Sequence, residues 1–270
     1  MNNSIKLTPE DERLLDLRKV LRNKLSTLIE EKYSMIEKEK SILTALYISK
    51  VGQLRYDLFV VETDIAKLKL EMHLLQGYVN QNKKIDFEAV NKEIEAVTEH
   101  HKQELEHKAQ QIMVAQHILS LPLLSDFEAA ELKRLYHIIV KRLHPDLNPD
   151  TSDDEKELFA QVQSAYKNGD IDLMRNLYEK MGKKEPVLPK PETLAYEVES
   201  LKKKIAKIQN DIEKLNNTFP FNQRDFLDNE VLVEKEQQRI REEIETKCKQ
   251  LDEYQQYVNV LRLWKPGLLN

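Results

Sequence analysis

The sequence predicts an all-α protein in which long antiparallel coiled-coil hairpins flank a shorter central helical hairpin. Of its 270 residues, 33% are charged and only 7% are aromatic, which favours long solvated helices over one thick core. Apolar residues recur in steps of three and four along most of the chain. These patterns divide it into an N-terminal coiled-coil bundle (1–117), a central segment (118–182), a proline-rich linker (183–192) and a C-terminal coiled-coil hairpin (193–270).

The N-terminal bundle is predicted to contain three helices. The first begins with Thr8 as a capping hydroxyl and Pro9 at the first helical position, and we expect a bend before Ser41. A short polar turn at 80–84 separates the second helix from a third that Asp86 can cap, so these two helices should form an antiparallel hairpin. The seam of the second helix is Tyr47, Val51, Leu54, Leu58, Val61, Ile65, Leu68, Met72, Leu75 and Val79.

The C-terminal region is predicted to contain two helices after a stiff linker with three prolines. A heptad seam runs from Leu194 to Leu215, Pro220 then turns the chain, and Asn222 is expected to cap the final helix. The turn favours pairing of these two helices with each other. Pairing between two copies of the chain, giving a homodimer, is the alternative.

Charge and cysteine content exclude several classes of protein. The 42 basic and 47 acidic residues are interleaved and leave a net charge of −5, which argues against a nucleic-acid or membrane surface. Cys248 is the only cysteine, so no intrachain disulfide or cysteine zinc site is possible. No stretch has the length and apolar character of a signal peptide or a membrane span. We therefore expect a soluble, cytoplasmic protein.

Catalytic and metal-binding signals are weak. His100, Glu104 and His107 share one helix face, and Glu-x-x-His is a spacing found in di-iron bundles, but no second motif supplies the facing ligands. The chain has no glycine-rich phosphate loop, nucleophile elbow or paired-carboxylate arrangement. We expect no enzyme, no cofactor and no metal. Late in the last helix, Tyr254, Tyr257 and Trp264 could form a partner-binding patch, although packing at a helix end is the simpler interpretation.

The central segment has the most specific pattern. Ser125 and Glu128 form a capping box that opens an amphipathic helix, and Pro145 must end this helix because it has no backbone N–H. A second helix follows, with its cap at 151–155 and an apolar face that ends at Tyr166. The first helix carries Lys133, Arg134, Lys141 and Arg142 against the single acid Glu131, and His137 and His144 can add positive charge at lower pH. A basic helix should therefore lie beside a turn that presents His144 and Asp146.

This order of parts resembles the J-domain of DnaJ-type co-chaperones. The matching stretches are Glu131 to Tyr136, then Lys141-Arg142-Leu143-His144-Pro145-Asp146-Leu147-Asn148-Pro149, then Phe159, Val162, Ala165 and Tyr166. The segment Ile118 to Leu124 is only loosely similar to the first helix of the family, so the third helix of the N-terminal bundle could take its packing role. After the motif, Asp170 is expected to cap a short replacement helix containing Ile171, Met174, Leu177 and Met181. The glycine/phenylalanine-rich and cysteine-rich zinc segments of DnaJ are absent.

The resemblance implies a co-chaperone that stimulates the ATPase of a DnaK-type chaperone and targets it to an unknown client through its coiled coils. In such families the loop aspartate, here Asp146, meets an arginine of the ATPase, and the residues equivalent to His144 and Pro145 set the loop geometry. The catalytic groups then belong to the partner. The alternative is a scaffolding coiled-coil protein whose J-like segment activates nothing. The expected partner-binding residues are Lys133, Arg134, His137, Lys141, Arg142, His144, Pro145 and Asp146.

Overall fold

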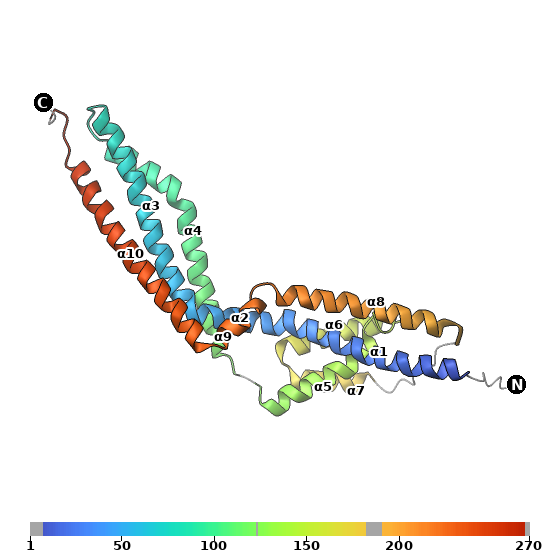
Figure 1. Cartoon of the computed structure of the whole chain (residues 1–270). Helices are drawn as coiled ribbons and strands as arrows, with labels where there is room; N and C mark the ends of the chain where they lie inside the picture. Colours follow the sequence, from blue (N-terminus) through green and yellow to red (C-terminus); the bar gives the residue numbers. More distant parts are fainter. Residues whose placement is uncertain (1–7, 123, 182–190, 268–270) are drawn as a thin grey trace. The chain divides into compact units, whose positions relative to one another are not determined.

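The computed structural model describes residues 8–122, 124–181 and 191–267, and these residues form helices and turns without any strand. They separate into two compact units, one made of residues 1–41 and 122–222 and the other of residues 42–121 and 223–270 (Figure 1). The α-helices are α1 (Pro9–Ser34), α2 (Lys40–Tyr47), α3 (Gln53–Asn80), α4 (Phe87–Ser120), α5 (Asp126–Leu143), α6 (Asp153–Asn168), α7 (Ile171–Lys180), α8 (Pro191–Asn216), α9 (Arg224–Leu227) and α10 (Glu230–Arg262).

The chain stays helical from α1 through α3 because two π-helical turns, Met35–Glu39 and Ile48–Gly52, join the α-helices. The predicted capping box opens α1, where the amide of Asp11 donates to Thr8 Oγ1 at 3.2 Å and the Asp11 carboxylate accepts from the amide of Thr8 at 2.8 Å. The first π-helical turn lies where the sequence predicts a bend, and it ends shortly before Ser41. A wider turn of this kind interrupts the regular hydrogen bonding of an α-helix without a glycine or proline.

In the first unit, α1 and α8 run parallel. Arg18 Nε lies 2.6 Å from Glu197 Oε2, and Lys32 Nζ lies 2.6 Å from Asp211 Oδ2. Both ion pairs join residues that are 179 positions apart, so the two helices advance in the same direction and in constant register. The predicted heptad seam of α8 is buried at Leu194, Val198, Leu201, Ile205, Ile208 and Ile212.

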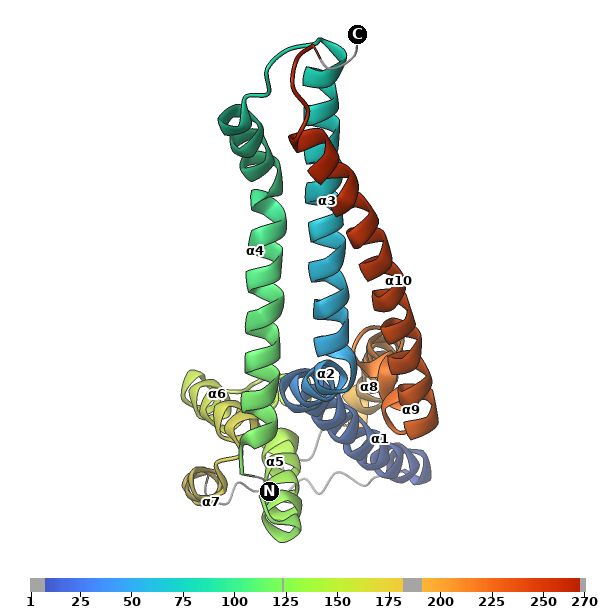
Figure 2. The ribbon, with the colours of Figure 1, turned by 90° about the vertical axis from the view of Figure 1, so that its left-hand side faces the viewer.

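In the second unit, α3 lies between α4 and α10 (Figure 2). Helices α3 and α4 form the predicted antiparallel hairpin, and Asp86 Oδ1 caps α4 by accepting from the amide of Ala89 at 3.1 Å. Helix α10 is parallel to α3, because Arg55 pairs with Glu236 and Glu62 pairs with Lys247 further along both helices. The end of this unit is closed by a cluster formed by Leu75, Ile85, Val90, Val258 and Leu261, against which Trp264 packs.

The predicted C-terminal hairpin is wrong, because α8 pairs with α1 in the first unit and α10 pairs with α3 in the second. The final helix is also capped later than expected, by Asn229 in place of Asn222. As a result, the compact units differ from the predicted ranges 1–117, 118–182 and 193–270. A heptad pattern shows that a helix needs a partner for its apolar face, but it does not show which helix provides that face.

Among residues 8–122, 124–181 and 191–267, every helix is too short or too polar to cross a lipid bilayer.

Candidate functional site

The central helical hairpin forms as its caps predict. The amide of Ser125 donates to Glu128 Oε2 at 3.0 Å at the start of α5, and the amide of Ser152 donates to Glu155 Oε2 at 3.0 Å at the start of α6. Both capping boxes are complete, with the reciprocal bond to the serine hydroxyl also present. Helix α5 ends at Leu143, directly before His144 and Pro145, so the motif lies in the loop between α5 and α6.

A stack of three tyrosines holds α5 and α6 against α1. Tyr136 of α5 is completely buried, and its ring centroid lies 4.0 Å from that of Tyr166 in α6 and 5.4 Å from that of Tyr33 in α1. The hydroxyl of Tyr166 donates to Glu30 Oε1 at 2.9 Å, and Lys133 Nζ lies 3.7 Å from the same oxygen. Stacked rings and a hydrogen bond to a buried carboxylate make this contact specific as well as apolar.

Helix α1 therefore takes the packing role that the sequence assigned to the third helix of the N-terminal bundle. That third helix is α4, which belongs to the other compact unit, and the segment beginning at Ile118 provides its last residues. The predicted replacement helix after α6 is confirmed as α7. Asp170 Oδ1 caps α7 by accepting from the amide of Leu173 at 2.9 Å, and Met174 and Leu177 are buried against the hairpin.

His144 shapes the loop through both its backbone and its ring. Its carbonyl accepts from the amides of Leu147 and Asn148, each at 2.9 Å. Its Nδ1 accepts from the amide of Asp146 at 3.1 Å, so the ring proton must be on Nε2, and the imidazole and the ring of Phe159 form a T-shaped pair at a centroid distance of 5.4 Å. Burial lowers the pKa of His144 below its usual value, which keeps the imidazole neutral at pH 7.

Arg22 of α1 holds the loop from outside the hairpin. Its guanidinium donates to the carbonyl of Leu147 at 2.5 Å, to Asn148 Oδ1 at 3.0 Å and to the carbonyl of Lys141 at 3.3 Å. One planar side chain thus joins the last turn of α5 to the loop. The Asn148 amide nitrogen adds a second link by donating to the Lys141 carbonyl at 3.1 Å. The sequence pattern of α1 does not distinguish Arg22 from its other exposed and half-buried basic residues.

Four of the basic residues predicted for the site lie on one side of α5. Lys133 and Arg134 are exposed, Lys141 is half-buried, and His137 Nε2 lies 3.5 Å from Ser26 Oγ of α1. Burial and the nearby charge of Lys141 lower the pKa of His137, so this imidazole adds no charge at neutral pH. The net result is a short basic surface next to the loop.

Arg142 lies elsewhere, against α7, where its guanidinium donates to the carbonyl of Met181 at 3.5 Å. Glu131, the one acid counted against the basic residues of α5, is paired with Arg175 of α7 at 2.5 Å. Hydrogen bonding to this guanidinium lowers the pKa of Glu131. Its charge is therefore balanced by a residue that the sequence pattern did not connect with α5.

The end of the loop is open to solvent. Pro145 is exposed, and the side chain of Asp146 keeps 49% of its surface accessible. Lys204 of α8 approaches the same residue, since its Nζ donates to the Asp146 carbonyl at 2.5 Å and lies 3.8 Å from Oδ1. A partner can therefore reach Asp146, although the residue already has a cation beside it.

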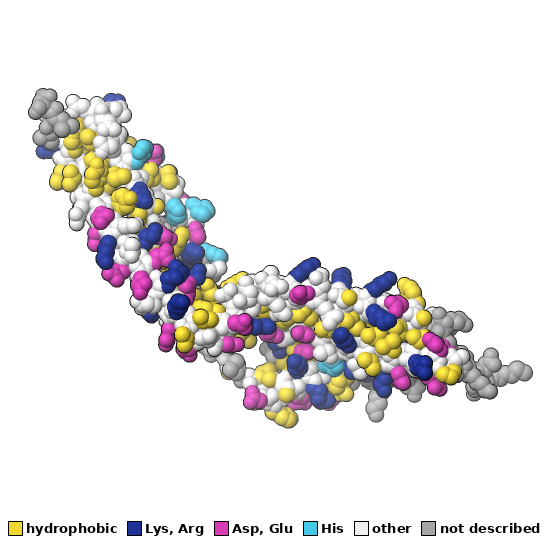
Figure 3. Space-filling view, viewed as in Figure 1, with side chains coloured by type: hydrophobic (Ala, Val, Ile, Leu, Met, Phe, Trp, Pro, Cys, Tyr) yellow, Lys and Arg dark blue, Asp and Glu magenta, His cyan; other side chains and the backbone are white. Residues whose placement is uncertain are grey.

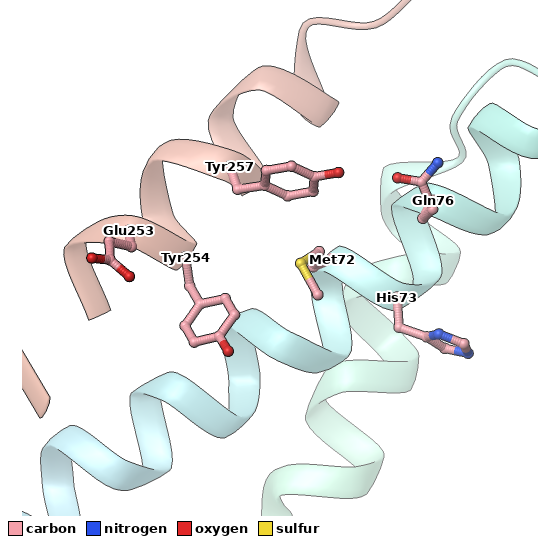
Figure 4. A pocket seen from close by; sticks show the side chains of 6 residues that line it. All are labelled: Met72, His73, Gln76, Glu253, Tyr254 and Tyr257. Atoms are coloured by element: carbon pink, nitrogen blue, oxygen red, sulfur yellow. The ribbon is translucent and has the colours of Figure 1, made fainter. Parts of the chain in front are cut away.

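The other candidates from the sequence lie in the second unit. His100 and His107 are exposed on α4, and in the described ranges no group of three or more His, Cys, Asp or Glu side chains is close enough to hold a metal ion. A solvent-open hollow of about 590 Å³ lies between α3 and α10, where Met72 points towards the rings of Tyr254 and Tyr257 (Figure 4). Hydrophobic side chains gather over this end of α3 and α10 (Figure 3). Trp264 packs into the end cluster.

Comparison of the chain with family models, with curated proteins and with solved structures found no match.

Proposed function

We propose that α5, α6 and α7, packed against α1, act as a divergent J-domain that stimulates the ATPase of a DnaK-type chaperone, and that the remaining helices target this activity to a client. The observation that carries the proposal is the end of the α5–α6 hairpin. There a histidine-proline turn presents the half-exposed carboxylate of Asp146 next to exposed basic residues of α5. This combination of a basic helix and one loop carboxylate is what the J-domain resemblance requires.

The electrostatics are compatible with docking on an acidic surface. Lys133 lies 3.7 Å from Glu30 of α1, and Glu131 is neutralised by Arg175, so Arg134 and Lys141 keep this side of the hairpin positive in a chain of net charge −5. Opposite charge on a partner would speed association and fix its orientation. Asp146 could then accept hydrogen bonds from a guanidinium of the ATPase. Nucleotide hydrolysis itself would be carried out by groups of the partner.

The test is steady-state ATP hydrolysis by a DnaK-type chaperone from the same source as this chain. We expect the intact protein to raise the rate and the Asp146→Asn variant to leave it at the basal value. Asp150→Asn is the matched control, because Asp150 is an exposed aspartate four residues further along the same loop. An absence of stimulation by the intact protein, or equal stimulation by Asp146→Asn, would exclude the proposal.

A scaffolding function is the second candidate, and the contacts of Arg22 and Lys204 with the loop favour it. These contacts make the loop a junction between the hairpin and the α1–α8 pair, which is a structural role in itself. In that case the chain would self-associate in light scattering and would not bind a DnaK-type chaperone. A homodimer that still stimulates the ATPase would support the co-chaperone function.

A further inference from the structure

The loop carboxylate of Asp146 has a cationic neighbour supplied by the chain itself. Lys204 Nζ donates to the Asp146 carbonyl at 2.5 Å and lies 3.8 Å from Oδ1, with 33% of the lysine side chain and 49% of the aspartate side chain exposed. Lys202 and Lys203 precede Lys204 on α8, but both are exposed, and Lys202 pairs with Glu199. Lys204 is half-buried, and it is set in position by the adjacent Ile205, which is buried in the seam with α1.

Several bonds that do not involve Lys204 hold the loop in shape. The loop is fixed by the guanidinium of Arg22, by the amide group of Asn148, and by the Nδ1 and carbonyl of His144. The hydroxyl of Thr151 adds a further bond by donating to the Asn148 carbonyl. None of these bonds has Lys204 as a partner. The contact of Lys204 with Asp146 therefore calls for an explanation other than loop geometry.

We propose that Lys204 is an internal competitor for the site at Asp146, so that docking of the chaperone exchanges the lysine ammonium for a cationic group of the partner. The inference rests on the proposed function. A guanidinium can bind both carboxylate oxygens at once, whereas the ammonium of Lys204 reaches the carboxylate only at 3.8 Å. The exchange thus favours a partner that offers an arginine. Removal of Lys204 should therefore lower the free-energy cost of docking.

Residues of α1 also contact part of the basic surface of α5. Glu30 lies 3.7 Å from Lys133, and Ser26 lies 3.5 Å from His137, so the α1 side of α5 is engaged within the chain. Arg134, which follows Lys133 on the same side of α5, is exposed. The α1–α8 pair therefore limits docking at two places, the α1 side of α5 and the loop at Asp146. Glu30 and Ser26 of α1 are buried, whereas Lys204 is half-exposed and can be changed at less risk to the fold.

The experiment compares the affinity of three proteins for a labelled, ATP-bound DnaK-type chaperone by fluorescence anisotropy. These are the wild type, Lys204→Gln and Lys203→Gln, where the last removes the same charge from the exposed neighbour. We expect Lys204→Gln to bind about two- to five-fold more tightly than both others, which is the range for a solvent-accessible ion pair. Lys204→Gln binding that is equal to or weaker than that of Lys203→Gln would overturn the inference.

Two further measurements separate the possible causes. Asp146→Asn should weaken binding in the wild-type background, and if it does so while Lys204→Gln has no effect, the proposed function stands and the competition is refuted. If neither the wild type nor Lys204→Gln binds, the proposed function fails and the inference with it. Amide hydrogen exchange of Leu147 and Asn148 should be unchanged in Lys204→Gln, and a loss of protection there would show that Lys204 holds the loop and would also overturn the inference.

Discussion

Replacement of Arg22 by methionine should destabilise the first unit more than any other single change on the surface of α1. The variant leaves the carbonyls of Leu147 and Lys141 and the side-chain oxygen of Asn148 without their shared donor. A hydrogen bond to a charged group makes a net contribution of about 1.5 to 3 kcal/mol to the free energy of unfolding. The bond from Arg22 to the Lys141 carbonyl is long, and that carbonyl still accepts from the Asn148 side-chain amide in the variant. The bonds to the Leu147 carbonyl and to Asn148 Oδ1 therefore account for most of the expected loss. With some water entering the half-buried site, we expect a loss of about 2 to 4 kcal/mol.

The assay is urea unfolding followed by circular dichroism, with Arg18→Met as the matched control. Arg18 lies one turn earlier on α1 and pairs with Glu197, and both side chains are partly exposed. A pair of this kind contributes about 0 to 1 kcal/mol. The fluorescence of Trp264, which packs in the second unit, provides an internal reference that should not shift. A loss of stability in Arg22→Met no larger than that in Arg18→Met would contradict the assigned role of Arg22.

Three further predictions concern buried or half-buried polar groups. Tyr166→Phe leaves the buried carboxylate of Glu30 without its hydroxyl donor, so the free energy of unfolding should fall by about 1 to 3 kcal/mol in urea titrations; an unchanged midpoint would contradict this. Arg262→Met leaves buried Glu71 without its bidentate partner, so a loss of about 2 to 4 kcal/mol should appear in the Trp264 fluorescence transition, and an unshifted transition would contradict this. Because burial lowers the pKa of His144 in the folded state, its contribution to the free energy of unfolding should be complete above about pH 6.5 and should fall as the pH drops below that value; His144→Gln should reduce this pH dependence, and an identical profile would disprove the assignment.

The local elements were predictable because they depend on neighbouring residues. The capping boxes at Ser125 and Ser152, the helix end before Pro145 and the short helix capped by Asp170 all follow from side-chain to backbone bonds within three or four positions. The hairpin of α3 and α4 was predictable for the same reason, since a short turn leaves two long helices one way to meet.

The pairing of distant helices was not predictable from a single sequence. Leu194 and Ile208 show that α8 has an apolar seam, but the same seam fits a partner from any other heptad segment. The ion pairs that fix the parallel register of α1 and α8 join residues 179 positions apart, and each is one match among many interleaved charges. The roles of Arg22 and Lys204 could not be predicted because their contacts with the loop depend on that long-range pairing.

The docking site for a DnaK-type chaperone can be mapped directly on this protein. Amide hydrogen exchange of the intact chain should be measured with and without the ATP-bound chaperone. We expect added protection at the end of α5 and in the loop, over residues 134–148, and none in the Asp146→Asn variant. Protection confined to other helices, or no change on addition of the chaperone, would contradict the claim that the His144-Pro145-Asp146 loop is its docking site.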